Sequence, residues 1–188
     1  MSRREGYDLY SKGSKLTRLN VPPGIHGPRG TRIKSQYGRQ LREKQKVKRL
    51  YGLMEKQFRN YVEKALKSRG NTGVVLLSLL ERRLDNVVYR LGFTPTRAAA
   101  RQLVSHRHVF LDGKKVNIPS YQVKPGETLT LTTKAMEIPS IKKLISEEHK
   151  VPSWLKRKKV AAQVVSMPKR EDIPEPMSEQ DIVEFYSR

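Results

Sequence analysis

The chain has 188 residues with 39 lysines and arginines against 18 aspartates and glutamates, so its formal net charge at pH 7 is +21. Such an excess repels itself in a compact fold, so we expect a polyanionic partner, nucleic acid first and an anionic membrane surface second. The longest apolar run, residues 74–80, is too short to span a bilayer, and the basic N-terminus lacks the apolar core of a signal peptide. The absence of cysteine excludes disulfides and thiolate metal sites.

The first part of the chain changes character near residue 36. Residues 1–35 are rich in glycine, proline and basic side chains without a sustained period, which predicts an extended basic arm. A strongly basic helix is then predicted up to Gly52, followed by a helix with periodic apolar side chains that ends near Gly70. Phe58, in this second helix, is interpreted as a core residue rather than a platform for base stacking.

Residues 74–91 have the clearest helical pattern in the chain. Leucine and valine side chains form one apolar arc, while Arg82, Arg83 and Arg90 fall on or near the opposite side. Gly92 follows at the position where a left-handed C-cap is usual. We therefore predict one helix over this segment.

The string TRAAARQLVSHRHVFLDGKKVNI, residues 96–118, predicts a short helix followed by a β-hairpin. Thr96 is a suitable N-cap, and Asp112-Gly113 is a strong signal for a two-residue hairpin turn. A further strand is predicted after the turn at Pro125-Gly126. Residues 80–135 thus form a unit of helix, helix, hairpin and strand.

The predicted helix after Thr96 exposes an unusually one-sided set of charges. Arg97 and Arg101 lie one turn apart, where like charges repel, and Ala98 between them leaves room for a sugar-phosphate backbone to approach. Guanidinium groups also match the geometry of phosphate. An ordinary solvated basic helix is the alternative, and this helix alone does not decide between the two. Neighbouring elements add further cations, which favours RNA: Arg82, Arg83, Arg90, Lys114 and Lys115.

Three strings resemble the ribosomal protein S4 (uS4) family of the small ribosomal subunit: LERRLDNVVYRLGFTPTRAAARQLVSHRHVFLDGKKVNIPSYQVKPGE, LREKQKVKRLYGLMEKQFRNY and IVEFYSR. We accordingly expect an α+β fold, in which a basic helical domain carries an inserted small RNA-binding module of two helices packed on a short, mainly antiparallel sheet. The expected divisions are an extended N-terminal arm (1–35), the first part of the helical domain (36–79), the RNA-binding module (80–135) and a C-terminal segment that packs back on the helical domain (136–188).

The resemblance implies a structural ribosomal protein, without catalysis, that binds the 5′ domain of 16S rRNA and nucleates assembly of the small subunit. The implied partners are 16S rRNA, ribosomal protein S5 and mRNA near its entrance, with a contribution to decoding accuracy. No cofactor, membrane contact or homo-oligomer is expected. The expected location is the small ribosomal subunit in the cytoplasm, with an organellar ribosome as the alternative. Family members usually have further residues before SRREG, so contacts of such an extension are not assumed.

By position, the resemblance implies that the residues facing rRNA are Arg82, Arg83, Arg97, Arg101, Gln102, Ser105, His106, Lys114 and Lys115. The loop HGPRGTRIKSQYG resembles the family's basic segment at the mRNA entrance, which assigns Arg29, Arg32 and Lys34 to mRNA. Asp85 is interpreted as mainly structural, a carboxylate available to orient a neighbouring arginine or to cap a loop. Some members bind zinc through cysteines that this chain lacks, so no metal is expected. His106 and His108 are expected to alternate on a strand and point to opposite faces.

Two other classes of protein use the same module. Pseudouridine synthases and some tRNA synthetases carry it beside a catalytic domain, but no nucleotide loop, metal-ligand set or catalytic triad is visible in this sequence. A free RNA-binding regulator would carry it with less flanking structure. Tyr89 and Tyr121 are open to either interpretation, as stacking platforms or as half-buried side chains, whereas Trp154 is expected to anchor the C-terminal segment.

Overall fold

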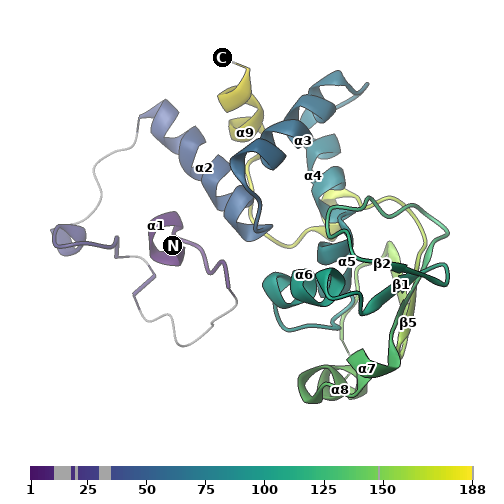
Figure 1. Cartoon of the computed structure of the whole chain (residues 1–188). Coiled ribbons are helices and arrows are strands. Elements are labelled where there is room, and N and C mark those ends of the chain that lie inside the picture. The colour runs from purple at the N-terminus through teal and green to yellow at the C-terminus, as the bar shows by residue number, and fades with distance from the viewer. Residues whose placement is uncertain (11–17, 20, 30–34, 148, 188) are drawn as a thin grey trace. The chain divides into compact units, whose positions relative to one another are not determined.

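The computed structural model describes residues 1–10, 18–19, 21–29, 35–147 and 149–187. The chain divides into two compact units, one formed by residues 1–75 together with 175–188 and the other by residues 76–174. The second unit is therefore inserted in the sequence of the first. Helices and an antiparallel sheet are both present, which confirms the α+β class (Figure 1).

The first unit is helical. Its described elements are α1 (Ser2–Glu5), the 3-10 helix η2 (Gly27–Arg29), α2 (Gln36–Leu50), α3 (Glu55–Lys67) and α9 (Glu179–Tyr186). The Ser35 hydroxyl caps α2 by accepting a hydrogen bond from the Gly38 N–H at 3.1 Å. Although α9 comes from the far end of the sequence, it packs beside α2 (Figure 1). The two helices predicted between residues 36 and 70 are confirmed.

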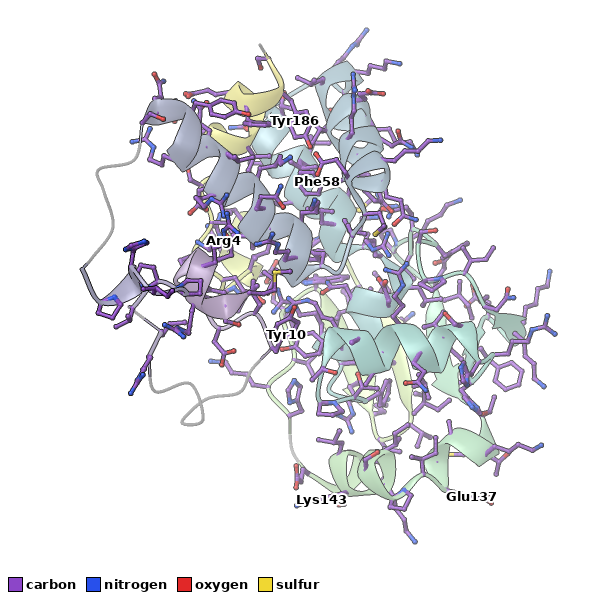
Figure 2. The ribbon with its side chains drawn as sticks, turned by 60° about the vertical axis from the view of Figure 1, so that its left-hand side comes forward. Arg4, Tyr10, Phe58, Glu137, Lys143 and Tyr186 are labelled. Carbon is purple, nitrogen blue, oxygen red and sulfur yellow. The ribbon has the colours of Figure 1, made fainter. Side chains whose placement is uncertain are left out.

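An apolar face of α3 holds the first unit together. Phe58, Val62 and Ala65 are buried there at helical spacing, as the sequence predicted. The Phe58 ring on α3 lies 6.1 Å, centroid to centroid, from the Tyr186 ring on α9 (Figure 2). This aromatic contact joins two segments that are widely separated in the chain.

A carboxylate and two lysines form an ion cluster in the same unit. The Glu55 carboxylate accepts hydrogen bonds from Lys44 and Lys48 at 2.7 Å and from the Tyr186 hydroxyl at 2.8 Å. Burial raises the pKa of the Glu55 carboxyl, but these hydrogen bonds and the charge of Lys44 outweigh it and lower the pKa to about 2. The cluster therefore joins α2, α3 and α9 while Glu55 is ionised.

The second unit combines helices with a sheet. The helix α4 (Thr72–Glu81) starts before the division at residue 75 and ends after it, and the elements that follow are α5 (Leu84–Arg90), α6 (Arg97–Ser105), β1 (Val109–Leu111), β2 (Lys114–Val116), β3 (Thr128–Leu131), α7 (Thr133–Met136), α8 (Pro139–Ser146), β4 (Leu155–Lys158), β5 (Ala161–Val164) and the 3-10 helix η3 (Arg170–Asp172). The strands lie in the order β2-β1-β3-β5-β4, with every neighbouring pair antiparallel. One apolar core joins α5, α6, α7 and α8 to the sheet.

The prediction of one helix over residues 74–91 is wrong, because the backbone breaks between α4 and α5. Arg83 has an extended conformation and forms a β-bridge with Gln122. The Val123 N–H donates to the Arg82 carbonyl and the Leu84 N–H to the Tyr121 carbonyl, both at 2.9 Å. A segment almost forty residues away in sequence thus supplies the hydrogen bonds that a continuous helix would have made.

Residues 136–174 belong to the second unit, so only the chain from residue 175 onward returns to the first. The hairpin of β4 and β5 extends the sheet, with Leu129 of β3 opposite Ala162 of β5. Sequence analysis did not predict these strands. Trp154, just before β4, is fully buried in this core, as expected of a packing anchor.

Arg157 shows how a basic residue of β4 serves the fold. Its guanidinium donates to the Leu91 carbonyl at 2.7 Å and to the Leu144 carbonyl at 2.9 Å, near the ends of α5 and α8. The same group lies 4.8 Å from the centroid of the Phe93 ring.

Among the described residues, no helix combines the length and the apolar character needed to cross a bilayer.

Candidate RNA-binding surface

The helix α6 forms as the sequence predicts. Its N-cap, Thr96, accepts a hydrogen bond from the Ala99 N–H at 3.2 Å. One face buries Ala100, Leu103 and Val104 in the core of the second unit. The remaining face reaches solvent, with half-buried or exposed side chains that include five of the residues predicted to face rRNA: Arg97, Arg101, Gln102, Ser105 and His106.

Arg97 is held in place by a chain of buried polar groups. Its Nε donates to Asn86 Oδ1 at 2.9 Å, and its guanidinium lies 4.5 Å from the centroid of the Tyr89 ring. The Asn86 amide donates in turn to the Glu81 carboxylate at 2.9 Å, and Arg90 donates to both oxygens of that carboxylate, at 2.8 and 2.9 Å. Since the partners of Arg97 are themselves fixed, its guanidinium needs little reordering to meet a phosphate.

Arg83 does not belong to this surface, contrary to the expectation that it faces RNA. Its side chain is only 1% exposed and forms a two-pronged ion pair with Asp85, at 2.7 and 3.1 Å. The Asp85 carboxylate also accepts from the Asn86 N–H at 2.9 Å. A buried charge is stable only when it is paired, so Arg83 is needed at the junction of α4 and α5. The interpretation of Asp85 as a carboxylate that orients an arginine is confirmed.

Arg82 keeps a position nearer the solvent. It is half-buried, and its Nε donates to the Val123 carbonyl at 2.9 Å. This hydrogen bond restrains the guanidinium beside the bridge that separates α4 from α5. Arg82 therefore remains a candidate for contact with RNA, while Arg83 beside it does not.

The predicted hairpin is confirmed, with β1 and β2 antiparallel and joined by Asp112-Gly113. Both turn residues have positive φ, 47° and 79°, which matches the twist of a two-residue hairpin. The Asp112 carboxylate accepts from the Thr128 N–H at 2.8 Å, which ties the turn to β3. This rigid turn presents Lys114 and Lys115, both exposed, on the edge strand β2.

Lys114 and Lys115 lie on opposite faces of the sheet. Lys114 is opposite Leu111, whose buried side chain faces the helices, whereas Lys115 is opposite Phe110 and its ammonium lies 5.7 Å from that ring. Lys114 therefore shares its face with α6, and Lys115 belongs to the other face. The sequence-based set of RNA-facing residues does not form one continuous plane.

The prediction that His106 and His108 alternate on a strand and point to opposite faces is wrong, because neither residue lies in a strand and residues two apart on a strand would share one face. Between them Arg107 has φ 61°, an uncommon left-handed conformation for arginine, and β1 begins only at Val109. The two imidazole rings lie 6.4 Å apart, centroid to centroid. Within the part of the chain that the structure describes, no group of three or more potential metal ligands is present.

Two of the three residues assigned to mRNA are not among the residues that the structure describes. Arg32 and Lys34 fall outside the described residues, and Arg29 is described only through its backbone, at the end of η2. Their assignment stays a prediction.

The support that Glu81 and Asn86 give to Arg97 was not predicted from the sequence. The spacing of these three residues indicates a contact only once the break between α4 and α5 is known.

Comparison with known proteins matches both parts of the chain to described families. Residues 1–81 match the family described as "Ribosomal protein S4/S9 N-terminal domain", and residues 82–129 match "S4 domain". The chain is 50% identical over 191 residues to small ribosomal subunit protein uS4 of Parabacteroides distasonis and 50% identical over 193 residues to that of Chlorobium limicola. It is 45% identical over 199 residues to that of Natranaerobius thermophilus. Each alignment covers 100% of this chain and 95% of the relative.

Proposed function

The chain belongs to the uS4 family of small ribosomal subunit proteins, and from this premise we propose that it binds a multi-helix junction in the 5′ domain of 16S rRNA and nucleates assembly of the small subunit. The family consists of structural ribosomal proteins and not of enzymes, and its S4 domain binds rRNA within the ribosome. The proposal adds which part of the rRNA is bound and which side chains bind it.

The observation that carries the proposal is the solvent-facing side of α6. There Arg97 is oriented by Asn86 and Tyr89, and Arg101 follows one turn later. Two guanidinium groups at this spacing repel each other in the free protein, and bound phosphates relieve that repulsion. The proposed rRNA contacts are Arg82, Arg97, Arg101, Gln102, Ser105, His106 and Lys114, without Lys115, which lies on the other face of the sheet.

Binding of this kind is mainly electrostatic. Side chains cannot read the deep, narrow major groove of A-form RNA, so contacts to phosphates and 2′-hydroxyls position the protein. The relative placement of the helices in a folded junction then supplies selectivity. A net charge of +21 accords with many phosphate contacts and with rapid, salt-sensitive association.

The test is a salt titration of the full chain with a transcript of the 5′ domain of 16S rRNA. The logarithm of the affinity should fall linearly with the logarithm of salt concentration, and Arg101→Ala should reduce the slope by about 0.7–0.9. A duplex RNA of equal length serves as the competitor. A shallow slope, or equal affinity for duplex and junction, would contradict the proposal.

Two further partners, ribosomal protein S5 and mRNA, are also part of this proposal. We infer contacts with ribosomal protein S5, a contribution to decoding accuracy, and contact of Arg29, Arg32 and Lys34 with mRNA at its entrance, by a single copy of the chain in a cytoplasmic ribosome. The basic composition of the segment around residues 29–34 supports the mRNA contact. Crosslinking from Arg32 within assembled subunits tests it, since no crosslink to mRNA is expected if this loop lies elsewhere.

A further inference from the structure

A small cavity opens between α6 and α8 in the second unit. Its volume is about 230 Å³, and its walls include Gln102, Leu103 and His106 of α6, His108 before β1, and Ser140 and Ile141 of α8. Sites that enclose drug-sized ligands usually measure about 300–1,000 Å³, so this cavity suits a smaller group such as one flat ring.

The lining of this cavity is divided between apolar and polar groups. Leu103 and Ile141 are buried and provide an apolar floor, while Gln102, His106 and Ser140 are exposed at the rim. A group that matches this division has an apolar face and a hydrogen-bonding edge. A nucleobase has both, and the Gln102 amide can donate and accept along that edge.

The cavity adjoins the proposed RNA contacts on α6. Around the helix, Arg101 and Ser105 occupy one exposed side, Gln102 and His106 come next, and Ala99 and Leu103 complete the turn toward the cavity. A strand whose phosphates lie on Arg101 therefore passes the cavity mouth within the width of one helix. Arg97 and Arg101, on the solvent-facing side of α6, attract a negatively charged partner to this helix.

We propose that this cavity binds one unpaired nucleobase, turned out of the RNA whose backbone lies on α6. The inference rests on the proposed function and deepens it, since it assigns a base contact to a surface otherwise occupied by phosphates. His106 and His108 stand 6.4 Å apart with their rings tilted by 35°, and the imidazole faces provide stacking surfaces for the base. His108 is steadied by Thr132, whose hydroxyl lies 3.3 Å from its Nδ1.

The site also explains why His106 and His108 are brought together. The left-handed backbone at Arg107 lies between the two histidines, and both of them line the same cavity. An uncommon conformation for arginine is maintained only where the surrounding structure supports it. The backbone hydrogen bond from the His108 N–H to the Leu103 carbonyl, at 3.2 Å, gives part of that support.

The experiment fills the cavity with a larger side chain and makes the same substitution elsewhere on α8 as a control. Ser140→Leu places an apolar side chain at the cavity wall, and Ser146→Leu makes the same change at an exposed position of α8 that does not line it. Each full-length variant is titrated with a transcript of the 5′ domain of 16S rRNA, once unmodified and once with single abasic nucleotides at its unpaired positions. Circular dichroism and thermal melting verify that each variant is folded.

With the unchanged protein, an abasic nucleotide at one unpaired position should weaken binding roughly 5- to 150-fold, as expected for loss of one stacked base. Ser140→Leu should weaken binding of the unmodified transcript to a similar extent and remove the difference at that position. Ser146→Leu should bind like the unchanged protein. Gln102→Ala, which keeps the apolar floor, should give a smaller loss centred on the same nucleotide.

The possible failures are distinguishable. If Ser140→Leu binds the unmodified transcript as tightly as Ser146→Leu does, or if no abasic position matters, the cavity takes no base and this inference is overturned while the proposed function stands. If the unchanged protein does not bind the transcript at all, the proposed function fails and the inference fails with it.

Discussion

Arginine occupies two different environments in the second unit. Arg83 and Arg90, here called the inner arginines, are 1% and 8% exposed and each is paired with a carboxylate, Asp85 or Glu81. Arg97 and Arg101, the outer arginines, lie on the solvent side of α6. The sequence shows all four as one basic cluster. The difference teaches that a cluster of cationic residues in the sequence can divide between arginines that build the fold and arginines that we propose contact RNA.

The largest effect is expected from removing an inner arginine. Arg83→Ala leaves the Asp85 carboxylate buried without its partner, so the free energy of unfolding should fall by about 3–5 kcal/mol. Urea denaturation measures this, with Arg101→Ala as the matched control, expected to lose no more than about 1 kcal/mol because its side chain is only half-buried. Equal stability of the two variants would erase the distinction between inner and outer arginines.

A smaller effect is expected at Asn86, which connects the two environments. Asn86→Ala removes the acceptor of Arg97 and a donor to Glu81, so stability should fall by about 1–3 kcal/mol and RNA affinity should fall as well. A double-mutant cycle with Arg97→Ala measures the coupling. Affinity losses that simply add would mean that Asn86 does not orient Arg97 for binding.

The two lysines of β2 test which face of the sheet RNA approaches. Because Lys114 shares the sheet face of α6 and Lys115 lies on the other face, Lys114→Ala should lower the salt slope of RNA binding by about 0.7–0.9. Lys115→Ala should leave the slope nearly unchanged in the same titration. The reverse order would show that RNA approaches the sheet from the side of Phe110.

The smallest effect is expected at Glu55 in the first unit, whose ion pairs with Lys44 and Lys48 are partly exposed. Its pKa is lowered from 4.5 to about 2, so its contribution to stability is present above pH 4.5 and is lost as the pH falls toward 2. The side chain is 48% exposed, which limits the contribution to less than about 1 kcal/mol. Acid denaturation compares the unchanged chain with Glu55→Gln, which should lose less stability over this range; parallel curves would contradict the assignment.

Local signals predicted much of the fold and part of the surface. The cap at Thr96 and the turn at Asp112-Gly113 carry their own geometry, so α6 and the hairpin were foreseen. The break at Arg83 was not, because it depends on a bridge to Gln122, a partner that no local pattern identifies. Likewise, the backbone conformation of Arg107, and with it the joint position of His106 and His108, comes from tertiary packing.

The strands β4 and β5 were missed for a related reason. They are short, and the first contains LKRK, in which Arg157 has a role that its charge does not reveal: it binds the carbonyls at the ends of two helices. The same ambiguity affected the nine residues predicted to face rRNA. Eight of the nine lie at positions that reach solvent, as residue type and spacing predicted. The burial of Arg83, and the placement of Lys114 and Lys115 on opposite faces, could not be predicted because they depend on how the strands assemble.

The insertion of one unit within the sequence of the other has a consequence for synthesis of the chain. Every strand and helix that residues 76–174 need has been translated before α9 emerges, whereas α2 and α3 wait for α9 to supply the Tyr186 ring and the Glu184 carboxylate, which accepts from Gln40 at 2.6 Å. Translation runs from the N-terminus, so the internal unit matures first and the opening helices stay uncovered on the nascent polypeptide. Chaperone capture during elongation should therefore concentrate on the segment made earliest.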